Sequence, residues 1–175
     1  MDLVRATPAE HAAPRPGDDV VPWADVVMDR AFTVDAPPAA VWPWLVQLGK
    51  RRAGWYLPRG VERLVPPGRR ALRRIEPRWQ QLRLGSVIPD YGGRHETFEV
   101  AAIDPPSSLV YRSRRGHTDV SWSITLTAVP GELTRVHLRL RMAPVRHRRL
   151  AEVGGGLIDL LTITGMAAGL RERLP

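Results

Sequence analysis

Five histidines, scattered carboxylates and a few hydroxyl groups are the side chains in this sequence that could perform acid–base or metal chemistry. No two histidines have the His-x-x-x-His or His-Glu-x-x-His spacing that holds a metal on one helix face. The chain has no cysteine, which excludes thiolate ligands, thiol nucleophiles and disulfides. It also has no Gly-x-Ser-x-Gly elbow and no phosphate-binding loop. We therefore expect no metal and no cofactor, and we assign no catalytic residue.

Two histidines keep an acid–base role open. His95 and His117 flank the ends of expected strands, with Asp90 and Asp119 nearby in the sequence. At the rim of a cavity, one of these histidines could serve as a general base. The alternative is that both are ordinary surface residues.

The chain carries a strong positive charge, with 26 Lys and Arg against 18 Asp and Glu. All of the basic residues except Lys50 are arginine, and they are spread along the chain without aromatic residues interleaved on one strand. This pattern predicts a solvated basic surface and no nucleic-acid partner. The longest apolar runs stay below 18 residues and no secretion leader is visible, so we expect a cytoplasmic protein without integral membrane association.

The elements that must position these side chains fall into one domain. Residues 1–22 are charged and proline-rich without an apolar period, which predicts a flexible N-terminal tail before a domain over 23–175. A helix is expected from Pro38 to Gly49, with Asp35 as its N-cap. Residues 50–84 are irregular, and short helical pieces are expected within them. Period-two alternation predicts antiparallel strands with one wet face over residues 26–34, 87–91, 96–103, 109–114, 118–129 and 133–142.

A long C-terminal helix is expected over 147–173, and it is apolar on more than one side. We expect one stripe to face the sheet; it consists of Leu150, Val153, Leu157, Leu160, Leu161, Thr164 and Ala168. The opposite side, with Ile163, Met166 and Leu170, would then meet residues 50–84, a second copy of the protein or a membrane surface. The glycines at 154–156 indicate either a bend or a close approach to the helix backbone.

Five short motifs occur along this order of elements. They are residues 32–42 (FTVDAPPAAVW), 45–49 (LVQLG), 54–56 (GWY), 121–122 (SW) and 134–135 (TR). Together they resemble the START-like or SRPBCC superfamily of polyketide cyclases and lipid-transfer domains, in an actinobacterial-type branch. The resemblance implies an α+β helix-grip fold, in which a curved antiparallel sheet wraps around the long C-terminal helix and encloses a hydrophobic cavity.

Polar candidates for that cavity come from two strands. Arg30 lies between Met28 and Phe32 on one strand face, where it could bind an anionic group or reach to water. Tyr111 and Ser113 share a face and could donate hydrogen bonds to a ligand, or lie at the rim. Asp159 lies opposite the helix stripe, so we expect it in solvent, with pairing to an arginine of another segment as the alternative.

Aromatic and aliphatic candidates complete the expected site. Trp122 would stack on a flat ligand or serve as plain core. Trp55 and Tyr56 would gate the cavity mouth or anchor their loop. Leu157 and Leu161 are expected to line the cavity from the helix.

The sequence therefore predicts non-covalent binding of a small hydrophobic or aromatic molecule, lipid-like or polyketide-like. Two alternatives remain open at this point. One is a polyketide cyclase or dehydratase acting in the same cavity, and the other is arginine-driven binding to a membrane surface or nucleic acid. A homodimer through the C-terminal helix is a further expectation.

Overall fold

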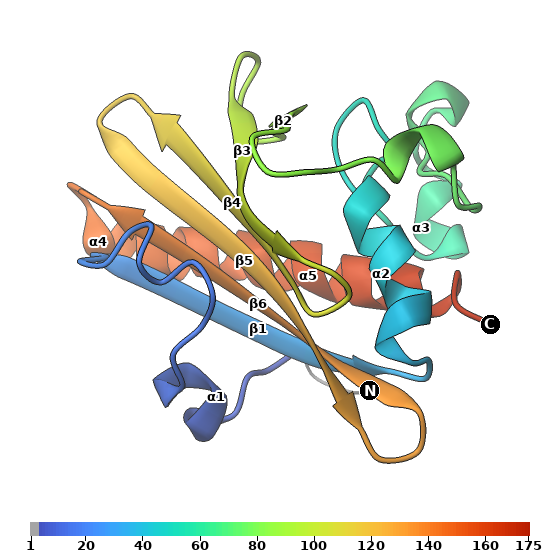
Figure 1. Cartoon of the computed structure of the whole chain (residues 1–175). Coiled ribbons are helices and arrows are strands. Elements are labelled where there is room, and N and C mark those ends of the chain that lie inside the picture. Colours follow the sequence, from blue (N-terminus) through green and yellow to red (C-terminus); the bar gives the residue numbers. More distant parts are fainter. Residues whose placement is uncertain (1–3) are drawn as a thin grey trace.

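The computed structural model describes residues 4–175, apart from the side chain of Leu150. Its centre is a curved six-stranded antiparallel sheet in the order β1-β6-β5-β4-β3-β2 (Figure 1). The strands are β1 (Val26–Val34), β2 (Val87–Pro89), β3 (Thr97–Asp104), β4 (Ser108–Arg115), β5 (Thr118–Val129) and β6 (Leu133–Ala143). All six lie where alternation predicts them, and β2 ends two residues early.

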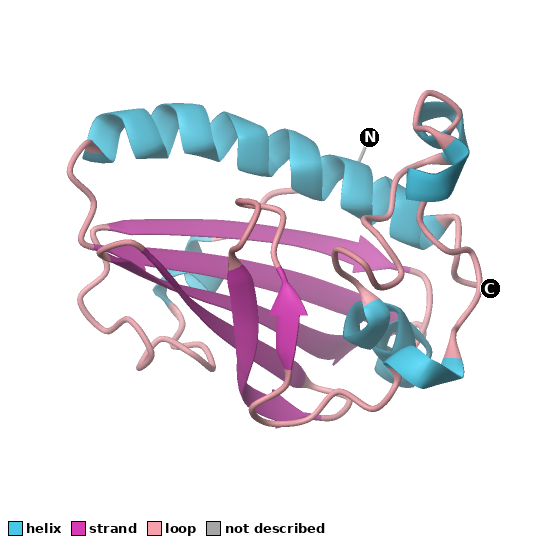
Figure 2. Cartoon of the chain, turned by 90° about the horizontal axis from the view of Figure 1, so that it is seen from above, coloured by secondary structure: helices cyan, strands magenta, loops and turns pink. Residues whose placement is uncertain are grey.

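One long helical rod lies across the inner face of the sheet (Figure 2). It consists of α4 (Arg148–Leu150), the π-helical turn η3 (Ala151–Gly155) and α5 (Gly156–Arg171). The glycine run falls in and beside the π turn, where a Cβ on Gly155 would stand 3.1 Å from Met28 Cε. The glycines therefore allow β1 to approach the helix closely. Together the sheet and this helix form the predicted α+β helix-grip architecture.

The helix faces the opposite way from the sequence-based prediction. Ile163, Met166 and Leu170 are buried on the sheet, whereas Leu157 and Leu161 are exposed. The reason lies at Gly165 and Gly169, where the segment 55–57 crosses the helix. A Cβ on Gly169 would stand 2.5 Å from Leu57 N, so only this glycine-bearing side of α5 can receive that backbone.

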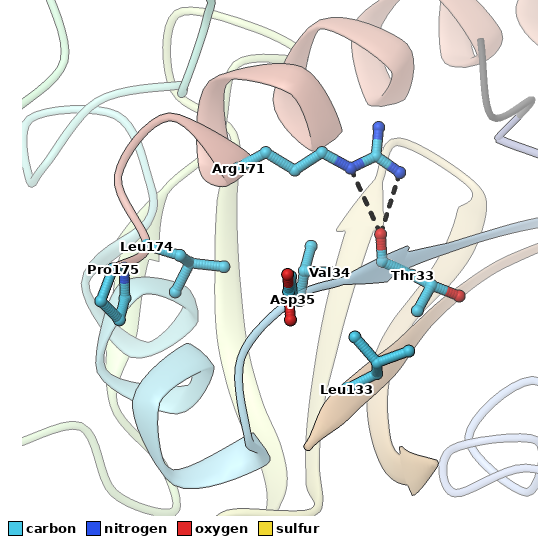
Figure 3. A pocket seen from close by; sticks show the side chains of 7 residues that line it. All are labelled: Thr33, Val34, Asp35, Leu133, Arg171, Leu174 and Pro175. Atoms are coloured by element: carbon cyan, nitrogen blue, oxygen red, sulfur yellow. Dashed lines mark hydrogen bonds between the residues drawn. The ribbon is translucent and has the colours of Figure 1, made fainter. Parts of the chain in front are cut away.

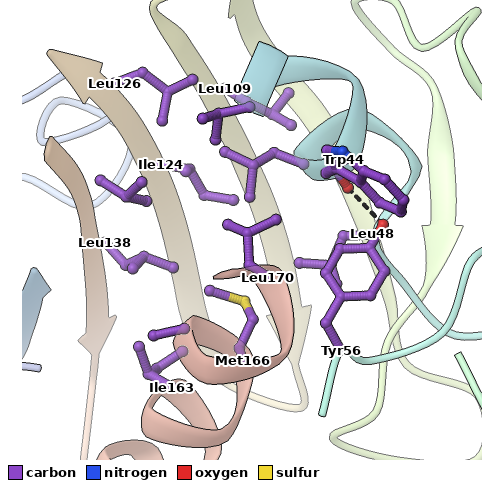
Figure 4. Close-up of a cluster of buried hydrophobic side chains, with 14 of the residues drawn as sticks. Trp44, Leu48, Tyr56, Leu109, Ile124, Leu126, Leu138, Ile163, Met166 and Leu170 are labelled. Carbon is purple, nitrogen blue, oxygen red and sulfur yellow. Dashed lines mark hydrogen bonds between the residues drawn. The ribbon is translucent and has the colours of Figure 1, made fainter. Parts of the chain in front are cut away.

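The hydrophobic core fills the end of the sheet where α5 meets α2 (Pro38–Gln47). Figure 4 shows Met166 and Leu170 of α5 directed toward Ile124 and Leu138 of the sheet, with α2 on the other side. The α2 helix begins after Pro37 without a side-chain cap, so the prediction of Asp35 as N-cap was wrong. Pro38 at the first helical position has no N–H, so one backbone group at the helix start needs no acceptor.

Residues 50–84 wrap around this core end of the molecule. They contain the short helix α3 (Arg59–Glu62) and two 3₁₀ turns, η1 (Pro67–Arg69) and η2 (Pro77–Trp79). Buried Arg173 ties the chain end to this region: it donates to Leu57 O, Leu72 O and Glu62 Oε1. The irregular segment is thus anchored on α5 and α2, and its residue Trp55 reaches the centre of the molecule.

The N-terminal segment lies on the outer face of the sheet, opposite α5 (Figure 1). Residues 8–12 form α1 (Pro8–Ala12), which Thr7 and Glu10 cap reciprocally. Val4, Ala6 and Val21 are buried. Residues 4–22 therefore form an ordered cover, in contrast to the predicted flexible tail, and they bury the face predicted to be wet. The cover is held by hydrogen bonds from outward arginines of β6 to backbone carbonyls of this segment. Contacts of this kind do not produce an apolar period in the sequence.

Candidate functional site

A cavity of about 650 Å³ lies between the inner face of the sheet and the first half of α5. The core fills the other end of the sheet, and at this end the side chains of the sheet and the helix leave the space open. The lining is mainly apolar and comes from the sheet, the helix, the end of α2 and the β2 loop. Its residues are Met28, Leu48, Gly49, Trp55, Ile88, Pro89, Asp90, Tyr91, Gly92, Phe98, Arg115, Trp122, Leu140, Met142, Gly155, Ile158, Asp159, Thr162 and Ile163.

Aromatic rings form one wall of this cavity. Trp122 of β5 and Trp55 stack with ring centroids 6.2 Å apart, and Phe98 of β3 lies 5.9 Å from Trp122. Tyr91 meets Trp55 edge to face at 6.0 Å. These four rings come from three separate parts of the chain. Packed on one another, they give the cavity an apolar aromatic boundary.

Two rings of this wall, Trp55 and Trp122, are held in place by neighbouring residues. Trp55 Nε1 donates to Thr162 O of α5 at 3.2 Å, which fixes the indole against the helix. Tyr111 of β4 stacks on the rear of Trp122 with centroids 5.7 Å apart, and burial raises the pKa of its hydroxyl. The wall is therefore preorganised before any ligand arrives.

An ion pair lies where the helix meets β1. Asp159 Oδ2 is 2.8 Å from Arg30 Nε, and Arg30 also donates to Gly156 O at 2.8 Å. Burial raises the pKa of Asp159 above its ordinary value, although the charge of Arg30 opposes this shift. Asp159 lines the cavity, so the predicted solvent position was wrong and the alternative of pairing with an arginine is confirmed.

A second ion pair lies at the loop that follows β2. Arg115 donates to Asp90 Oδ2, and its guanidinium stands 5.4 Å from the ring centroid of Phe98. Lys50 Nζ donates to the carbonyls of Asp90 and Gly93, at 2.9 and 2.7 Å. The loop that carries Tyr91 is thus held by two cations, and the cavity has polar groups at two separate places.

The sequence-predicted binding residues divide into three groups. Trp55 and Trp122 line the cavity. Arg30 and Tyr111 lie behind the lining, where Arg30 contacts Asp159 and Tyr111 supports Trp122. The third group does not line the cavity, and it consists of Tyr56, Ser113, Leu157 and Leu161.

The members of the third group have identifiable surroundings. Tyr56 is fully buried in the core, where its hydroxyl donates to Trp44 O at 2.7 Å, so it anchors its loop. Leu157 and Leu161 are exposed because α5 presents its other side to the sheet. Ser113 lies on β4 beside Val120 of β5.

The two histidines considered as general bases do not reach the cavity. His95 and His117 are exposed and lie outside its lining. Within residues 4–175, no three His, Asp or Glu side chains gather closely enough to hold a metal ion. Asp159 and Asp90 are the acid groups that do line the cavity.

Sequence reasoning did not nominate Phe98, Tyr91, Ile158 or Thr162 for the site. Phe98 had a usable signal, since it is the aromatic residue of a strand that alternates apolar and polar residues. Tyr91 follows a strand and precedes two glycines, which marks it only as a loop residue. Ile158 and Thr162 required knowledge of how α5 is rotated.

A smaller hollow of about 340 Å³ lies at the far end of α5 (Figure 3). There Arg171 donates from Nε and Nη2 to Thr33 O, and Leu133, Leu174 and Asp35 complete the wall. The hollow has no aromatic residue and is separated from the larger cavity by the core. We therefore take the larger cavity as the candidate site.

The fold and this cavity define a helix-grip domain with an internal apolar cavity, and the comparisons give its family. Residues 25–174 match the family of polyketide cyclase, dehydrase and lipid-transport proteins, and the chain belongs to this family. This confirms the resemblance to the START-like or SRPBCC superfamily. The search of curated proteins finds no match.

Solved structures agree with the fold at low sequence identity. CalU16 from Micromonospora echinospora is 19% identical with a TM-score of 0.50, over 84% of this chain and 83% of that one. Protein MLL2253 from Mesorhizobium loti is 19% identical with a TM-score of 0.51, over 85% and 98%. DynU16, from the dynemicin biosynthetic locus, is 17% identical with a TM-score of 0.51, over 83% and 46%.

Proposed function

We propose that this protein binds a small hydrophobic molecule with a flat aromatic or polyketide-like portion, without forming a covalent bond to it. The observation that carries the proposal is the stacked wall of Trp55, Trp122 and Phe98 along an apolar cavity. A volume of about 650 Å³ lies within the range of pockets that bury small organic ligands. Asp159 and the Arg115–Asp90 pair provide the few polar groups that would orient such a molecule.

Native mass spectrometry of the protein purified from its own host is the first test. We expect a stoichiometric adduct that departs on denaturation and whose extract contains an aromatic or acyl-chain compound. A protein that carries no adduct and binds no aromatic probe would contradict the proposal. The same spectrum reports whether the protein is a monomer or the predicted homodimer.

Direct titration with 2-naphthol and an anthraquinone gives the second test. Replacing Trp122 with Ala removes an indole from the cavity wall, and we expect about a tenfold loss of affinity. Tyr91→Ala is the companion variant, because Tyr91 is half exposed and its loss leaves the core intact. Trp23→Phe is the matched control, since Trp23 is exposed and outside the cavity lining. Equal affinity in all four proteins would place binding elsewhere.

Asp159 favours a second function, a cyclase or dehydratase acting in the same cavity. A partly buried carboxyl whose pKa is raised can take a proton from carbon next to a carbonyl and return it to a departing hydroxyl. Asp159→Asn would then abolish turnover of a β-hydroxy ketone probe while leaving its affinity within about threefold of that of the original protein. Unchanged turnover in this variant, or none in the original protein, leaves binding as the function.

A further inference from the structure

The outward side of α5 is an apolar surface that no part of this chain between residues 4 and 175 covers. Val153, Leu157 and Leu161 are 76%, 58% and 65% exposed, and Leu160 lies beside them at 36%. Val153 lies in the π turn η3 and the three leucines lie in α5, so together they form one stripe along the helical rod. We refer to these four residues as the outer stripe. Isolated exposed leucines are ordinary, but a contiguous stripe of this kind marks an interaction surface.

The helix that bears the outer stripe is unusually apolar for one so exposed. Residues Ala151–Arg171 form the helix within 4–175 that is long and apolar enough to cross a membrane, with a mean hydropathy of 1.5. Only 28% of its most apolar stretch is buried in the protein. Its C-terminal half is packed on the sheet through Met166 and Leu170, so it cannot leave the domain without opening the core. The exposed half is therefore placed to lie along an apolar boundary rather than across it.

Cationic and aromatic residues gather at the start of this helix. Arg146, Arg148 and Arg149 are exposed there. The chain before β1 meets the same place, since Asp25 Oδ2 accepts from Val145 N at 2.8 Å and Asp25 Oδ1 lies 3.9 Å from Arg148. Two residues before Asp25, Trp23 is 89% exposed. The contacts of Asp25 bring the chain that carries Trp23 near the start of the helix, and exposed tryptophan and arginine are side-chain types that settle at a membrane–water interface.

We propose that the outer stripe, Trp23 and the three arginines dock this protein on the surface of an anionic lipid bilayer. The leucines would enter the headgroup–acyl boundary while the guanidinium groups contact phosphates. Charge distinguishes this occupant from a second copy of the chain. The protein carries a net charge of +8, and of the acidic groups near the stripe Asp25 already contacts Arg148, leaving Glu152 exposed. Two such surfaces would repel each other, whereas an anionic bilayer attracts each of them.

The docking surface borders the cavity, which gives the docking a consequence. Ile158, Asp159 and Gly155 line the cavity from the same half of the helix, and Ile158 is also exposed. A docked protein would hold its cavity beside the bilayer, so an apolar ligand could pass between them with little exposure to water. This consequence rests on the proposed ligand binding, whereas the docking itself does not.

Flotation with lipid vesicles tests the docking directly. The full chain is mixed with vesicles of phosphatidylcholine alone, or of phosphatidylcholine with phosphatidylglycerol. We expect binding to the anionic vesicles, weaker binding to the neutral ones, and a steep loss of binding as salt is added. Failure of the original protein to bind anionic vesicles at low salt would overturn the proposal.

Two variants separate the apolar and electrostatic parts. Leu157→Ser with Leu161→Ser is expected to lower the partition coefficient at least about tenfold. Replacing Arg146, Arg148 and Arg149 with Gln is expected to lower it on the order of 100-fold. Leu64→Ser and Arg112→Gln are matched controls at exposed positions away from the helix, and they should bind as the original protein does. If the partition coefficient fell as much in these controls, overall charge and hydrophobicity would explain the binding, and the proposed surface would be contradicted.

Light scattering on the same proteins addresses the second copy. A stable dimer that the Leu157→Ser, Leu161→Ser variant converts to a monomer would assign the outer stripe to self-association and overturn the docking. A monomer that floats with anionic vesicles supports it. The Trp122→Ala variant distinguishes the two proposals, because its affinity for the aromatic probe should fall while its binding to vesicles should not change. Loss of flotation in Trp122→Ala would contradict a docking surface that lies outside the cavity.

Discussion

Two surfaces of this protein have burial opposite to their composition. The outer face of the sheet carries Asp29, His137 and Arg139, yet each of these is at least 95% buried, beneath residues 4–22. The outer stripe, along η3 and α5, carries valine and leucines and is largely exposed. The polar surface finds its partners within the chain, whereas the apolar surface finds none among residues 4–175.

The polar surface is held together by the contacts of Arg139 and Asp29. Arg139 pairs with Asp29 at 2.8 Å and Asp18 at 2.9 Å, and it also donates to the carbonyls of Glu10, His11 and Ala13. Buried charge is tolerated only when paired and hydrogen-bonded in this way. An apolar stripe has no such directional requirement, so it can stay open for an external partner. In these two surfaces, whether a side chain is buried therefore depends more on the contacts available to it within the chain than on its polarity.

The largest expected effect is at the centre of the polar surface. Arg139→Met removes the guanidinium and leaves Asp29 buried without its main partner, so we expect a loss of about 3–5 kcal/mol in the free energy of unfolding. Urea denaturation measures it. Arg112→Met is the matched control, since its pair with Glu99 is exposed and is worth less than about 1 kcal/mol. Similar losses in both variants would mean that a buried ion pair in this network stabilises the fold no more than an exposed one.

The next effect concerns the residue that sets the rotation of α5. Gly169→Ala would place a Cβ within 2.5 Å of Leu57 N and 2.6 Å of the Tyr56 carbonyl carbon, which are backbone atoms that cannot turn aside. We expect a loss of about 3 kcal/mol by urea denaturation. Gly60→Ala is the control, because nothing lies within 4 Å of its Cβ position. A neutral Gly169→Ala would remove our explanation for the outward direction of the apolar stripe.

A pH titration probes the polar surface without replacing a residue. Burial alone would raise the pKa of Asp29, but hydrogen bonds from His137 and Arg139 and the charge of Arg139 lower it from 3.8 to about 2. A carboxyl whose pKa is lowered in the folded state stabilises that state above the unfolded pKa. This contribution, about 2 kcal/mol, is lost as the pH falls from about 4 to 2. Glu10 adds to the same trend, because its hydrogen bond with Arg135 lowers its pKa to about 2.

Denaturation at a series of pH values measures this loss. The variant Asp29→Asn has no carboxyl to protonate, so its stability should be lower at neutral pH and should fall less steeply between pH 4 and 2. The original protein losing no stability across that range would contradict the assigned role of Asp29. A parallel fall in the two proteins would assign the acid sensitivity to other carboxyls.

Alternation and the family motifs were sufficient to predict the sheet and the helix-grip fold. In β5 the residues that face the core are apolar and the residues between them are polar, so the strand is visible as alternation in the sequence. The same alternation predicted a wet outer face and missed the cover. Contacts from Arg139 to backbone carbonyls of residues 10–13 depend on no particular side chains in that segment. Hydrogen bonds of this kind leave no compositional trace.

The candidate site was predictable only where a residue lies on an alternating strand or within a family motif. Trp122 follows from strand alternation, and Trp55 from its family motif. Ile158, Asp159 and Thr162 depend on the rotation of a helix that is apolar on every side. Its periodicity is compatible with either apolar side facing the sheet. The close contacts at Gly165 and Gly169 decide which side does so. The sequence shows where a glycine is, but it does not show which segment of backbone packs against that glycine.

The smallest expected effect is on the outer stripe itself. Leu161→Ser changes an exposed side chain that packs on nothing essential to the fold, so the free energy of unfolding should change by less than about 0.5 kcal/mol. Leu170→Ala on the buried side of the same helix is the matched comparison, with an expected loss of about 2–5 kcal/mol. A loss above 1 kcal/mol for Leu161→Ser, measured by urea denaturation at dilute concentration, would show that the stripe is already covered when the protein folds. A near-zero value, together with reduced vesicle binding, would mean that these leucines are retained for contact with a partner, because the folded domain does not need them.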